Sequence, residues 1–463
     1  MEKMLNEISE VVNKNMNDLL LNLKKQIEIQ SVEGKPVENA PYGKAVGDAL
    51  EGLLALGSDM GFSVKNHEGY VGTIEWGEGK EILGVLSHVD VVPPGDIAAW
   101  NTPPYEMTLK EGYLYGRGVA DDKGPLLSAL YGMYALKQIG FTPKKRIRFI
   151  IGTNEETGWG CINYYKAHCE TPDLSFSPDG MFTVVNREKG IFSANFQKSM
   201  IHEIVTISGG EAGNLVPSKA EAILNCSVDA VKKAVDSCKA PKGAIFHYEA
   251  CGAGTKLNCT GKSAHAMNPE KGISAVEGIL CVISACEGIS SDLKNTVAEL
   301  LSLIGNSPDG KGIGIACSDE VSGILTVNLG MLSLKDNLLS LKFDIRTPVT
   351  ADLDDIISKA ENTLAQCGYK MSDRHIKYPL YVPTDSELVK TLCNVYTTVT
   401  EEEAVLCSIG GGTYARAFPN CVCFGAVYPK EVLTVHAPNE RALEANVIKN
   451  AMMYGLAVYE LSK

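Results

Sequence analysis

Apolar residues recur with a helical period at the start of the chain. Six of them lie three or four positions apart: Ile8, Val12, Met16, Leu19, Leu23 and Ile27. This spacing places them on one face and predicts an amphipathic helix over residues 1–29, packed on a domain. A loop containing Gly and Pro follows over residues 31–43, and a second helical stretch then runs towards residue 56.

The pattern changes over residues 82–92, where β-branched and other apolar residues follow one another until a Pro-Pro-Gly sequence ends the run. A run that is apolar on both faces is typical of a central strand in a parallel sheet. A helical pattern over residues 126–139 and a further apolar run over residues 147–151 come next. Strand, helix and strand in this order predict an α/β domain with a mostly parallel sheet.

The middle of the chain, residues 187–378, has a different pattern. Short strands alternate there with helical stretches, the strands near residues 201–207, 222–228, 324–329 and 341–345 and the helices over residues 275–286 and 352–367. A helix over residues 386–399, a Gly-rich loop and a last strand and helix then return to the α/β pattern. We therefore predict one α/β domain, formed by residues 1–186 and 379–463, interrupted by an inserted α+β domain.

Composition and charge narrow the class of protein. The chain has 463 residues, 45% hydrophobic and 21% charged, as is ordinary for a soluble globular enzyme. Its formal net charge of −13 argues against nucleic acid or an anionic membrane surface as the main partner. The start lacks the apolar stretch of a signal peptide, and the most apolar segment, residues 278–286, is about half the ~18 residues of a membrane span. We expect a cytoplasmic protein with no membrane partner and with reduced cysteines.

The first candidate site residues lie at the carboxyl end of the apolar run over residues 82–92. His88 and Asp90 share a face of the predicted strand, because strand side chains alternate. Ligands bind at the carboxyl ends of strands in open α/β sheets, and a carboxylate beside a histidine fixes its tautomer and makes it a better metal ligand. A buried His–Asp pair with a structural role explains this fragment equally well.

Four further fragments carry acidic residues or a histidine. They contain Asp121 and Asp122 before a predicted helix, Glu155 and Glu156 after a strand, Asp179 in a Pro-Asp-Gly sequence, and His436 where a strand is predicted to end and a helix to begin. Each acidic fragment alone has an ordinary structural explanation: a helix cap for Asp121 and Asp122, a solvated loop for Glu155 and Glu156, and a turn for Asp179. Together the fragments place two histidines and several carboxylates at strand ends of one predicted sheet. This set suits Zn, Mn or Co, and is large enough for two ions about 3.5–4 Å apart.

These fragments resemble those of a known family. The motifs SHVDVVPPG, YGRGVADDKGP, GTNEETGWGC, SPDG and VHAPNE stand in the order typical of the co-catalytic zinc peptidases. That family includes aminoacylase-1, carnosinase, carboxypeptidase G2-like enzymes and succinyl-diaminopimelate desuccinylase. The sequences EETGWGCINYY and GGGTYAR, with the long insertion, most resemble the bacterial PepV-type dipeptidases. The resemblance covers essentially the whole chain and implies that the α/β domain is catalytic and the inserted domain a lid.

The resemblance also implies roles for the residues of the candidate metal site. One divalent ion, Zn or Mn, would be held by His88, Asp121 and Asp179, and a second by Asp121, Glu156 and His436, with Asp121 as the bridge. Asp90 would orient His88, and Glu155 would act as general base for the attacking water. The family has a non-proline cis peptide bond after its bridging aspartate, which implies one between Asp121 and Asp122.

Four residues outside these fragments resemble substrate-binding residues of the family. His265 would donate to the developing oxyanion, Arg346 would bind a substrate carboxylate, and Asn214 and Gly411 would contact the substrate. From the sequence, a surface-loop histidine and a pairing of Arg346 with Asp344 are the alternatives. Dimeric relatives take the lid histidine from a second subunit. The insertion here, roughly 190 residues, exceeds one compact lid domain, so we expect His265 to act within its own chain and the protein to be a monomer.

The predicted function is that of a metal-dependent dipeptidase acting on short unblocked peptides. An N-acyl amino acid deacylase, of the desuccinylase or aminoacylase type, would use the same two-metal site and is the alternative. A non-catalytic binding protein on an inherited scaffold is a third possibility. The complete set of metal ligands and base argues against the third, because relaxed selection should remove at least one of them.

Overall fold

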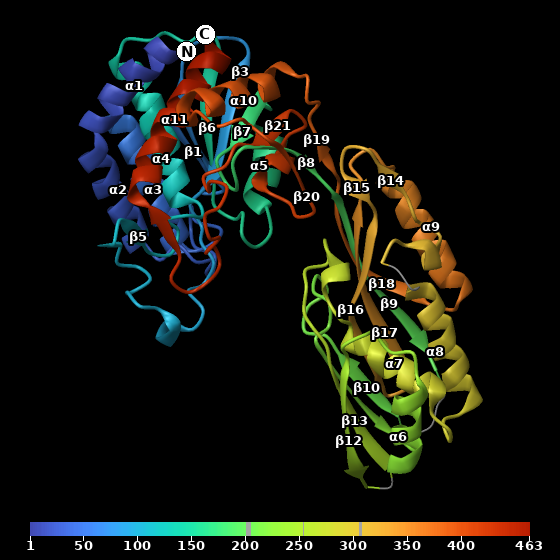
Figure 1. Cartoon of the computed structure of the whole chain (residues 1–463). Helices are drawn as coiled ribbons and strands as arrows, with labels where there is room; N and C mark the ends of the chain where they lie inside the picture. Colours follow the sequence, from blue (N-terminus) through green and yellow to red (C-terminus); the bar gives the residue numbers. More distant parts are fainter. Residues whose placement is uncertain (201–204, 253, 305–307) are drawn as a thin grey trace. The chain divides into compact units, whose positions relative to one another are not determined.

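The computed structural model describes residues 1–200, 205–252, 254–304 and 308–463. It divides the chain into two compact units, shown in Figure 1. Unit 1 consists of residues 1–186, 381–407 and 412–463, and unit 2 of residues 187–380 and 408–411. Most of the strand predicted over residues 201–207 lies outside the described residues.

Unit 1 is built on a sheet whose central strands run parallel. Its strands, in order across the sheet, are β1 (Ser63–His67), β2 (Val71–Trp76), β6 (Arg146–Gly152), β3 (Ile82–His88), β7 (Leu174–Ser177), β21 (Cys421–Cys423), β8 (Val184–Glu188) and β19 (Leu380–Tyr381), with β20 (Leu406–Ile409) beside β8. The pairs β6–β3, β3–β7 and β7–β21 are parallel, whereas β1–β2 and β2–β6 are antiparallel. Every residue of β3 is buried, which accounts for its apolar sequence on both faces.

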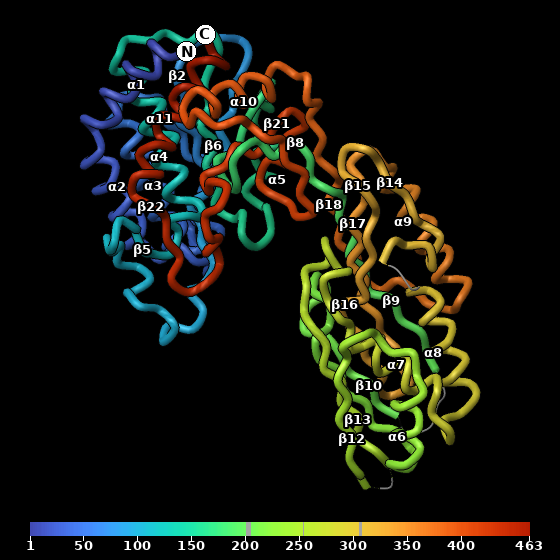
Figure 2. The backbone as a smooth tube through the Cα atoms, in the orientation of Figure 1, coloured from blue at the N-terminus to red at the C-terminus, as the bar shows by residue number. Residues whose placement is uncertain are grey.

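Helices cover this sheet. They are α1 (Glu2–Lys14), α2 (Met16–Glu28), α3 (Lys44–Asp59), α4 (Lys123–Gln138), α5 (Gly160–His168), α10 (Glu387–Thr400) and α11 (Glu444–Ser462). Figure 2 shows α1, α4 and α11 side by side, and the two chain ends lie in this unit. The helices α4 and α11 approach closely at Gly132, where a Cβ atom would lie 2.5 Å from the carbonyl oxygen of Ala451. Only glycine fits at that crossing.

Three details of the predicted elements in unit 1 are wrong. The helix over residues 1–29 is two helices, broken at Asn15, although the apolar stripe is buried through both except at the half-buried Met16. The strand over residues 82–92 ends at His88, and a buried loop without strand pairing follows. No strand precedes His436 and no helix follows it directly, because residues 431–440 are irregular. A short strand, β22 (Arg441–Leu443), then pairs with β5 (Tyr113–Tyr115), and α11 follows it.

The main sheet of unit 2 is antiparallel and is covered by helices. The strand order is β12 (Ile245–Cys251), β13 (Gly254–Thr260), β11 (Lys219–Leu224), β10 (Thr206–Gly209), β16 (Thr326–Lys335), β17 (Leu338–Thr347), β9 (Gly190–Ser199) and β18 (Lys370–Lys377). The helices α6 (Val228–Ser237), α7 (Ala275–Ala285), α8 (Ser291–Ile304) and α9 (Leu353–Gln366) share an apolar core with this sheet. Strands and helices of both units thus confirm the predicted fold class, an α/β sheet interrupted by an α+β segment.

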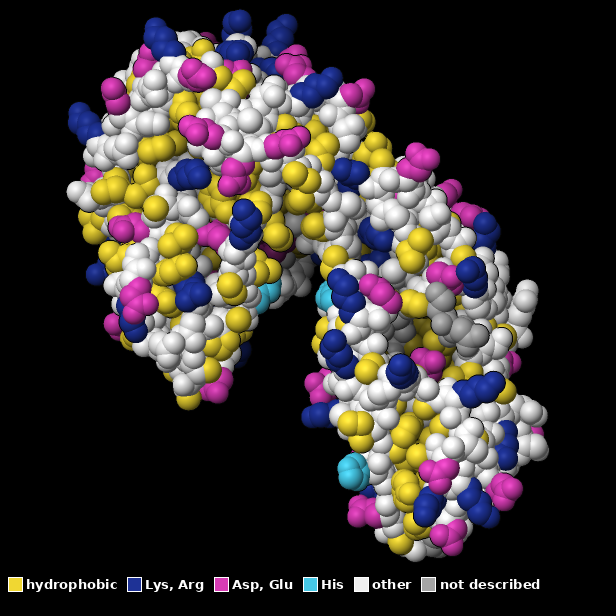
Figure 3. Space-filling view, viewed as in Figure 1, with side chains coloured by type: hydrophobic (Ala, Val, Ile, Leu, Met, Phe, Trp, Pro, Cys, Tyr) yellow, Lys and Arg dark blue, Asp and Glu magenta, His cyan; other side chains and the backbone are white. Residues whose placement is uncertain are grey.

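Three further features concern the apolarity of the helices, the charges on the surface and the cysteines. Within the described ranges, every helix falls short of the length and apolarity needed to cross a bilayer. Figure 3 shows acidic and basic side chains interspersed over the visible face of each unit. All fourteen cysteines lie in the described part of the chain, and each of them is a free thiol.

Candidate metal centre

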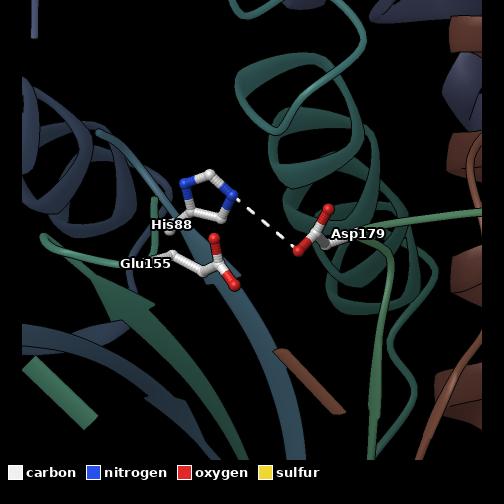
Figure 4. A group of neighbouring side chains, drawn as sticks. All are labelled: His88, Glu155 and Asp179. Atoms are coloured by element: carbon white, nitrogen blue, oxygen red, sulfur yellow. Dashed lines mark ion pairs between the residues drawn. The ribbon is translucent and has the colours of Figure 1, made fainter. Parts of the chain in front are cut away.

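Three neighbouring strands of unit 1 deliver ligand-bearing side chains to one edge of the sheet. His88 ends β3 and pairs in register with Gly152 at the end of β6, three residues before Glu155. Asp179 lies two residues beyond β7, on the other side of β3. Figure 4 shows the side chains of His88, Glu155 and Asp179 turned towards one another. One ligand atom from each of the three lies within 4.8 Å of the other two.

The imidazole of His88 has the environment of a metal ligand. The side chain is 0% exposed, and its Nδ1 lies 2.9 Å from the backbone carbonyl of Asp90, which fixes Nδ1 as the protonated nitrogen. Among the described residues, Nε2 has no hydrogen-bond partner. It lies 3.3 Å from Asp121 Oδ1 and 3.8 Å from Asp179 Oδ2. Two ligands of one tetrahedral Zn²⁺ stand about 3.4 Å apart, so a cation fits between these atoms.

Asp121 lies between the two histidines. Its Oδ1 faces His88 Nε2 at 3.3 Å, and its Oδ2 faces His436 Nε2 at 3.0 Å. The same His436 nitrogen lies 3.0 Å from Glu156 Oε2. One carboxylate oxygen towards each histidine is the geometry of a ligand that bridges two cations. The peptide bond between Asp121 and Asp122 is cis, as the family resemblance implied.

Asp90 holds the loop that carries the adjacent glutamates. Its Oδ1 accepts a hydrogen bond from the backbone N–H of Glu155 at 3.1 Å, and its Oδ2 accepts one from Glu156 at 3.0 Å. The carboxylate lies 3.4 Å from His88 Nδ1, farther than the backbone carbonyl of the same residue. The carboxylate of Asp90 therefore places the two glutamates and also lies against His88, whose Nδ1 is held by the backbone carbonyl of the same residue.

Trp159 contacts the predicted general base. Its indole N–H donates to Glu155 Oε1 at 3.1 Å, and its ring packs edge-on against Tyr414 with centroids 5.5 Å apart. Burial raises the pKa of Glu155 to about 7, with a further rise from Glu156 against a lowering by His88. A carboxylate with a pKa near neutrality is well matched to proton transfer.

The charges of the site favour bound cations. Hydrogen bonds that its imidazole donates to the carboxylates of Asp121 and Glu156 raise the pKa of His436 to about 10. Burial alone would lower the pKa of His88, but Asp121 and Asp90 hold it well above its ordinary value. Burial and Asp121 together raise the pKa of Asp179 well above its ordinary value. Without metal, this cluster therefore compensates its negative charge with protons, and two divalent cations would replace them.

Unit 2 brings together the residues predicted to bind substrate. The backbone carbonyl of Asn214 accepts a hydrogen bond from Ala266 at 2.9 Å, beside His265. Arg346 donates through Nε and Nη2 to the two oxygens of Asp344 at 2.6 and 3.0 Å, and through Nη1 to Gly410, next to Gly411, at 2.7 Å. The pairing of Arg346 with Asp344 is therefore present. Since a guanidinium has five N–H donors and three of them are engaged by described residues, the other two could serve a ligand.

His265 is held as a hydrogen-bond donor within the same cluster. The backbone N–H of Met267 donates to His265 Nδ1 at 3.2 Å, so Nδ1 is unprotonated and Nε2 carries the proton. Burial and the neighbouring Arg346 lower the pKa of His265, which keeps the imidazole neutral. A neutral imidazole with a protonated Nε2 is able to donate to an oxyanion.

Three residues at the centre of unit 1 escape the sequence analysis. Arg117 and Glu440 form a buried ion pair at 2.5 Å, and Trp159 reaches Glu155 as described above. Glu440 stands four residues after His436 in the motif VHAPNE, which is a weak signal. Arg117 and Trp159 give the same weak signal, since they stand in the motifs YGRGVADDKGP and GTNEETGWGC, but their partners are fixed only by the folded chain.

Comparisons with known proteins relate the whole chain to one group. The model of Peptidase family M20/M25/M40 matches residues 84–460. A Bacillus subtilis (strain 168) protein named "Putative dipeptidase YtjP" is 36% identical over 471 residues, covering 98% of this chain and 99% of that protein. The Beta-Ala-Xaa dipeptidase of Lactobacillus delbrueckii subsp. lactis is 33% identical, with 96% of each covered. The solved structure of the di-peptidase Dug1p from Saccharomyces cerevisiae shares the fold, with a TM-score of 0.60, 15% identity and 100% of both chains covered.

Proposed function

The chain belongs to peptidase family M20/M25/M40, and from this premise we propose that it is a dipeptidase that cleaves short unblocked peptides at a centre of two divalent ions. The observation that carries the proposal is the position of Asp121, whose two carboxylate oxygens face His88 and His436 at 3.3 and 3.0 Å. The relatives named as dipeptidases support the choice of substrate.

The residues of unit 1 would hold the two ions in two overlapping groups. We assign His88, Asp121 and Asp179 to one Zn²⁺ or Mn²⁺, and Asp121, Glu156 and His436 to the other. The chemistry that such ions supply when bound is polarisation of the scissile carbonyl and a lower pKa of the attacking water. Oxygen and nitrogen ligands without thiolates suit either metal.

Glu155 would move the proton during hydrolysis. Its carboxylate lies beside His88 and Asp179, and the Trp159 indole holds one oxygen in place. We propose that Glu155 takes a proton from the attacking water and delivers it to the leaving amine. In unit 2, Arg346 would bind the substrate carboxylate and His265 would donate Nε2–H to the developing oxyanion, with Asn214 and Gly411 as further substrate contacts.

A panel of substrates tests the proposed reaction. The metal-stripped chain, reloaded with Zn²⁺ or Mn²⁺, is offered unblocked dipeptides, including a β-alanyl dipeptide, beside the same amino acids carrying N-acetyl or N-succinyl groups. We expect hydrolysis of the unblocked dipeptides and at least about tenfold slower cleavage of the acyl compounds. The reverse preference would establish the deacylase instead.

We also propose that the protein is a cytoplasmic monomer whose His265 serves its own chain. The basis is the size of unit 2, residues 187–380 with 408–411, which exceeds one compact lid domain of the kind that the dimeric relatives need. Sedimentation of the active chain at assay concentration measures the mass of the working species. If the active species is a dimer, and activity is lost when that dimer dissociates, this part of the proposal is refuted.

Metal affinity is expected to rise with pH. A metal ligand must be a neutral imidazole, yet Asp121 and Glu156 raise the pKa of His436 to about 10 and so keep it protonated. Each displaced proton makes the apparent affinity rise about tenfold per pH unit below that pKa. Calorimetric titration with Mn²⁺ at about pH 6 and about pH 8 measures this slope. An affinity that does not change over this interval would contradict the assignment of His436.

Trp159→Phe is expected to lower kcat about tenfold while KM and the metal content stay unchanged. Phenylalanine keeps the ring that packs on Tyr414 but removes the N–H that holds Glu155. One hydrogen bond to a charged group contributes about 1.5 kcal/mol, which corresponds to roughly tenfold in rate. Steady-state kinetics with elemental analysis of the purified variant measures both quantities. An unchanged kcat would show that this contact does not serve the base.

A further inference from the structure

One fully buried carboxylate has no part in the proposed reaction, yet it touches the loop of the bridging ligand. Glu440 is 0% exposed. Its Oε1 accepts hydrogen bonds from the backbone N–H groups of Gly118, Ala120 and Asp121 at 3.0, 3.0 and 3.2 Å. Its Oε2 lies 2.5 Å from Nη1 of Arg117. One side chain thus holds the backbone of the segment that ends at Asp121.

The same residue belongs to the loop of the second histidine. Glu440 follows His436 by four residues, in a segment that forms neither helix nor strand over residues 431–440. Two residues of this segment, His436 and Asn439, have positive φ angles of 61° and 63°. The backbone carbonyl of Glu440 also accepts a hydrogen bond from Gly116 at 3.1 Å. Because no regular element fixes this segment, its position depends on contacts of this kind.

The buried ion pair of Arg117 and Glu440 is better explained by a role in positioning the backbone than by a gain in folding stability. Arg117 and Glu440 are 1% and 0% exposed, and removing two charges from water costs about as much as their attraction returns. An apolar pair would therefore stabilise the fold equally well. What an apolar pair lacks is an acceptor for three converging N–H groups, which the carboxylate supplies.

We propose that Glu440 is a positioning residue of the metal centre, which fixes the spacing between Asp121 and His436. The side-chain hydrogen bonds of Glu440, within the described part of the chain, go to Arg117 and to backbone N–H groups; it acts through the backbone of Asp121 on one side and through its own chain to His436 on the other. This inference rests on the proposed function, since the ion assigned to Asp121, Glu156 and His436 is the one whose affinity it concerns.

Glu440→Gln tests the role directly. The amide must turn its N–H₂ group towards either the guanidinium of Arg117 or the three backbone N–H groups, so one set of donors loses its acceptor. Partners of this kind typically change metal affinity about 10–100-fold. We expect that loss when the metal-stripped full chain is titrated calorimetrically with Mn²⁺. The matched control is Glu75→Gln, which removes the negative charge paired with Arg148 elsewhere in unit 1 and should bind Mn²⁺ as the unmodified chain does.

A second pair of variants separates position from folding stability. Both carry Arg117→Met, which removes the ion pair, and one adds Glu440→Gln while the other adds Glu440→Met. The glutamine oxygen can still accept from the three N–H groups, with its amide nitrogen turned to the methionine. The Gln form should therefore bind Mn²⁺ within about tenfold of the unmodified chain, and the Met form a further 10–100-fold more weakly.

The measured affinities distinguish a failure of the positioning role from a failure of the proposed function. If Glu440→Gln, or the Met form of the second pair, binds Mn²⁺ as tightly as the unmodified chain, the positioning role is wrong while the proposed function stands. If the unmodified chain itself binds no Mn²⁺, the proposed function fails first. If the Gln form of the second pair binds Mn²⁺ more tightly than the Met form, the inference is supported even where Glu440→Gln alone does not fold.

Discussion

Asp121→Asn is expected to remove both metal ions and to lower kcat/KM for dipeptide hydrolysis about 10⁴-fold or more, equivalent to at least about 5 kcal/mol of transition-state stabilisation. An asparagine offers one oxygen and no charge, so it cannot face His88 and His436 with two anionic oxygens as Asp121 does. Elemental analysis of the purified variant and a dipeptide assay with added Mn²⁺ measure the two effects.

The control for this variant is another Asp→Asn change in unit 1. Asp96 is exposed, and its Oδ1 accepts a hydrogen bond from the backbone N–H of Ala98 at 3.0 Å. Asparagine caps such a turn as well as aspartate does, so Asp96→Asn should keep its metal content and activity. Two ions retained by Asp121→Asn, in the amounts found in Asp96→Asn, would exclude Asp121 as the bridge.

Glu155→Gln is expected to lower kcat about 10²–10⁴-fold, or about 3–5 kcal/mol, while both ions stay bound. Glutamine keeps an oxygen for the indole N–H of Trp159 and a backbone N–H for Asp90, so the loop should keep its place. What is lost is the group that accepts and returns the proton. Single-turnover hydrolysis, measured at saturating dipeptide on the metal-loaded variant, isolates this step.

The adjacent residue provides the matched comparison. Glu156 faces His436 and should serve as a metal ligand, so Glu156→Gln is expected to lose metal affinity and to regain activity at high Mn²⁺. Glu155→Gln should not respond to added metal. If the two variants behave alike, or if excess Mn²⁺ restores Glu155→Gln, the division of labour between the two glutamates is wrong.

The elements predicted best are those with a purely local pattern. The buried strand ending at His88 and the helix α4 follow from runs of apolar residues with a clear period, and the structure has both. The apolar pattern does not reveal the break at Asn15, because α1 and α2 contribute to one continuous apolar stripe. The irregular segment over residues 431–440 was predicted as strand and helix, since its shape depends on Glu440 contacting a loop some 320 residues away.

The same distinction applies to the candidate site. Strand ends are readable in the sequence, and the residues expected there, His88, Glu155 and Asp179, do converge in the structure. The hydrogen bonds that place them are not readable, because each joins distant segments. The carboxylate of Asp90 lies 3.4 Å from His88 Nδ1, in line with the expected orienting role, but its hydrogen bonds from the backbone of Glu155 and Glu156 have no signal in the sequence. The metal-binding roles themselves remain a prediction.

Anomalous diffraction from a crystal of the full chain soaked in Mn²⁺ or Zn²⁺ tests the central claim most directly. We predict two peaks about 3.5–4 Å apart, one on each side of the Asp121 carboxylate, the first beside His88 and the second beside His436. A single peak, or peaks that the carboxylate of Asp121 does not contact, would contradict the account.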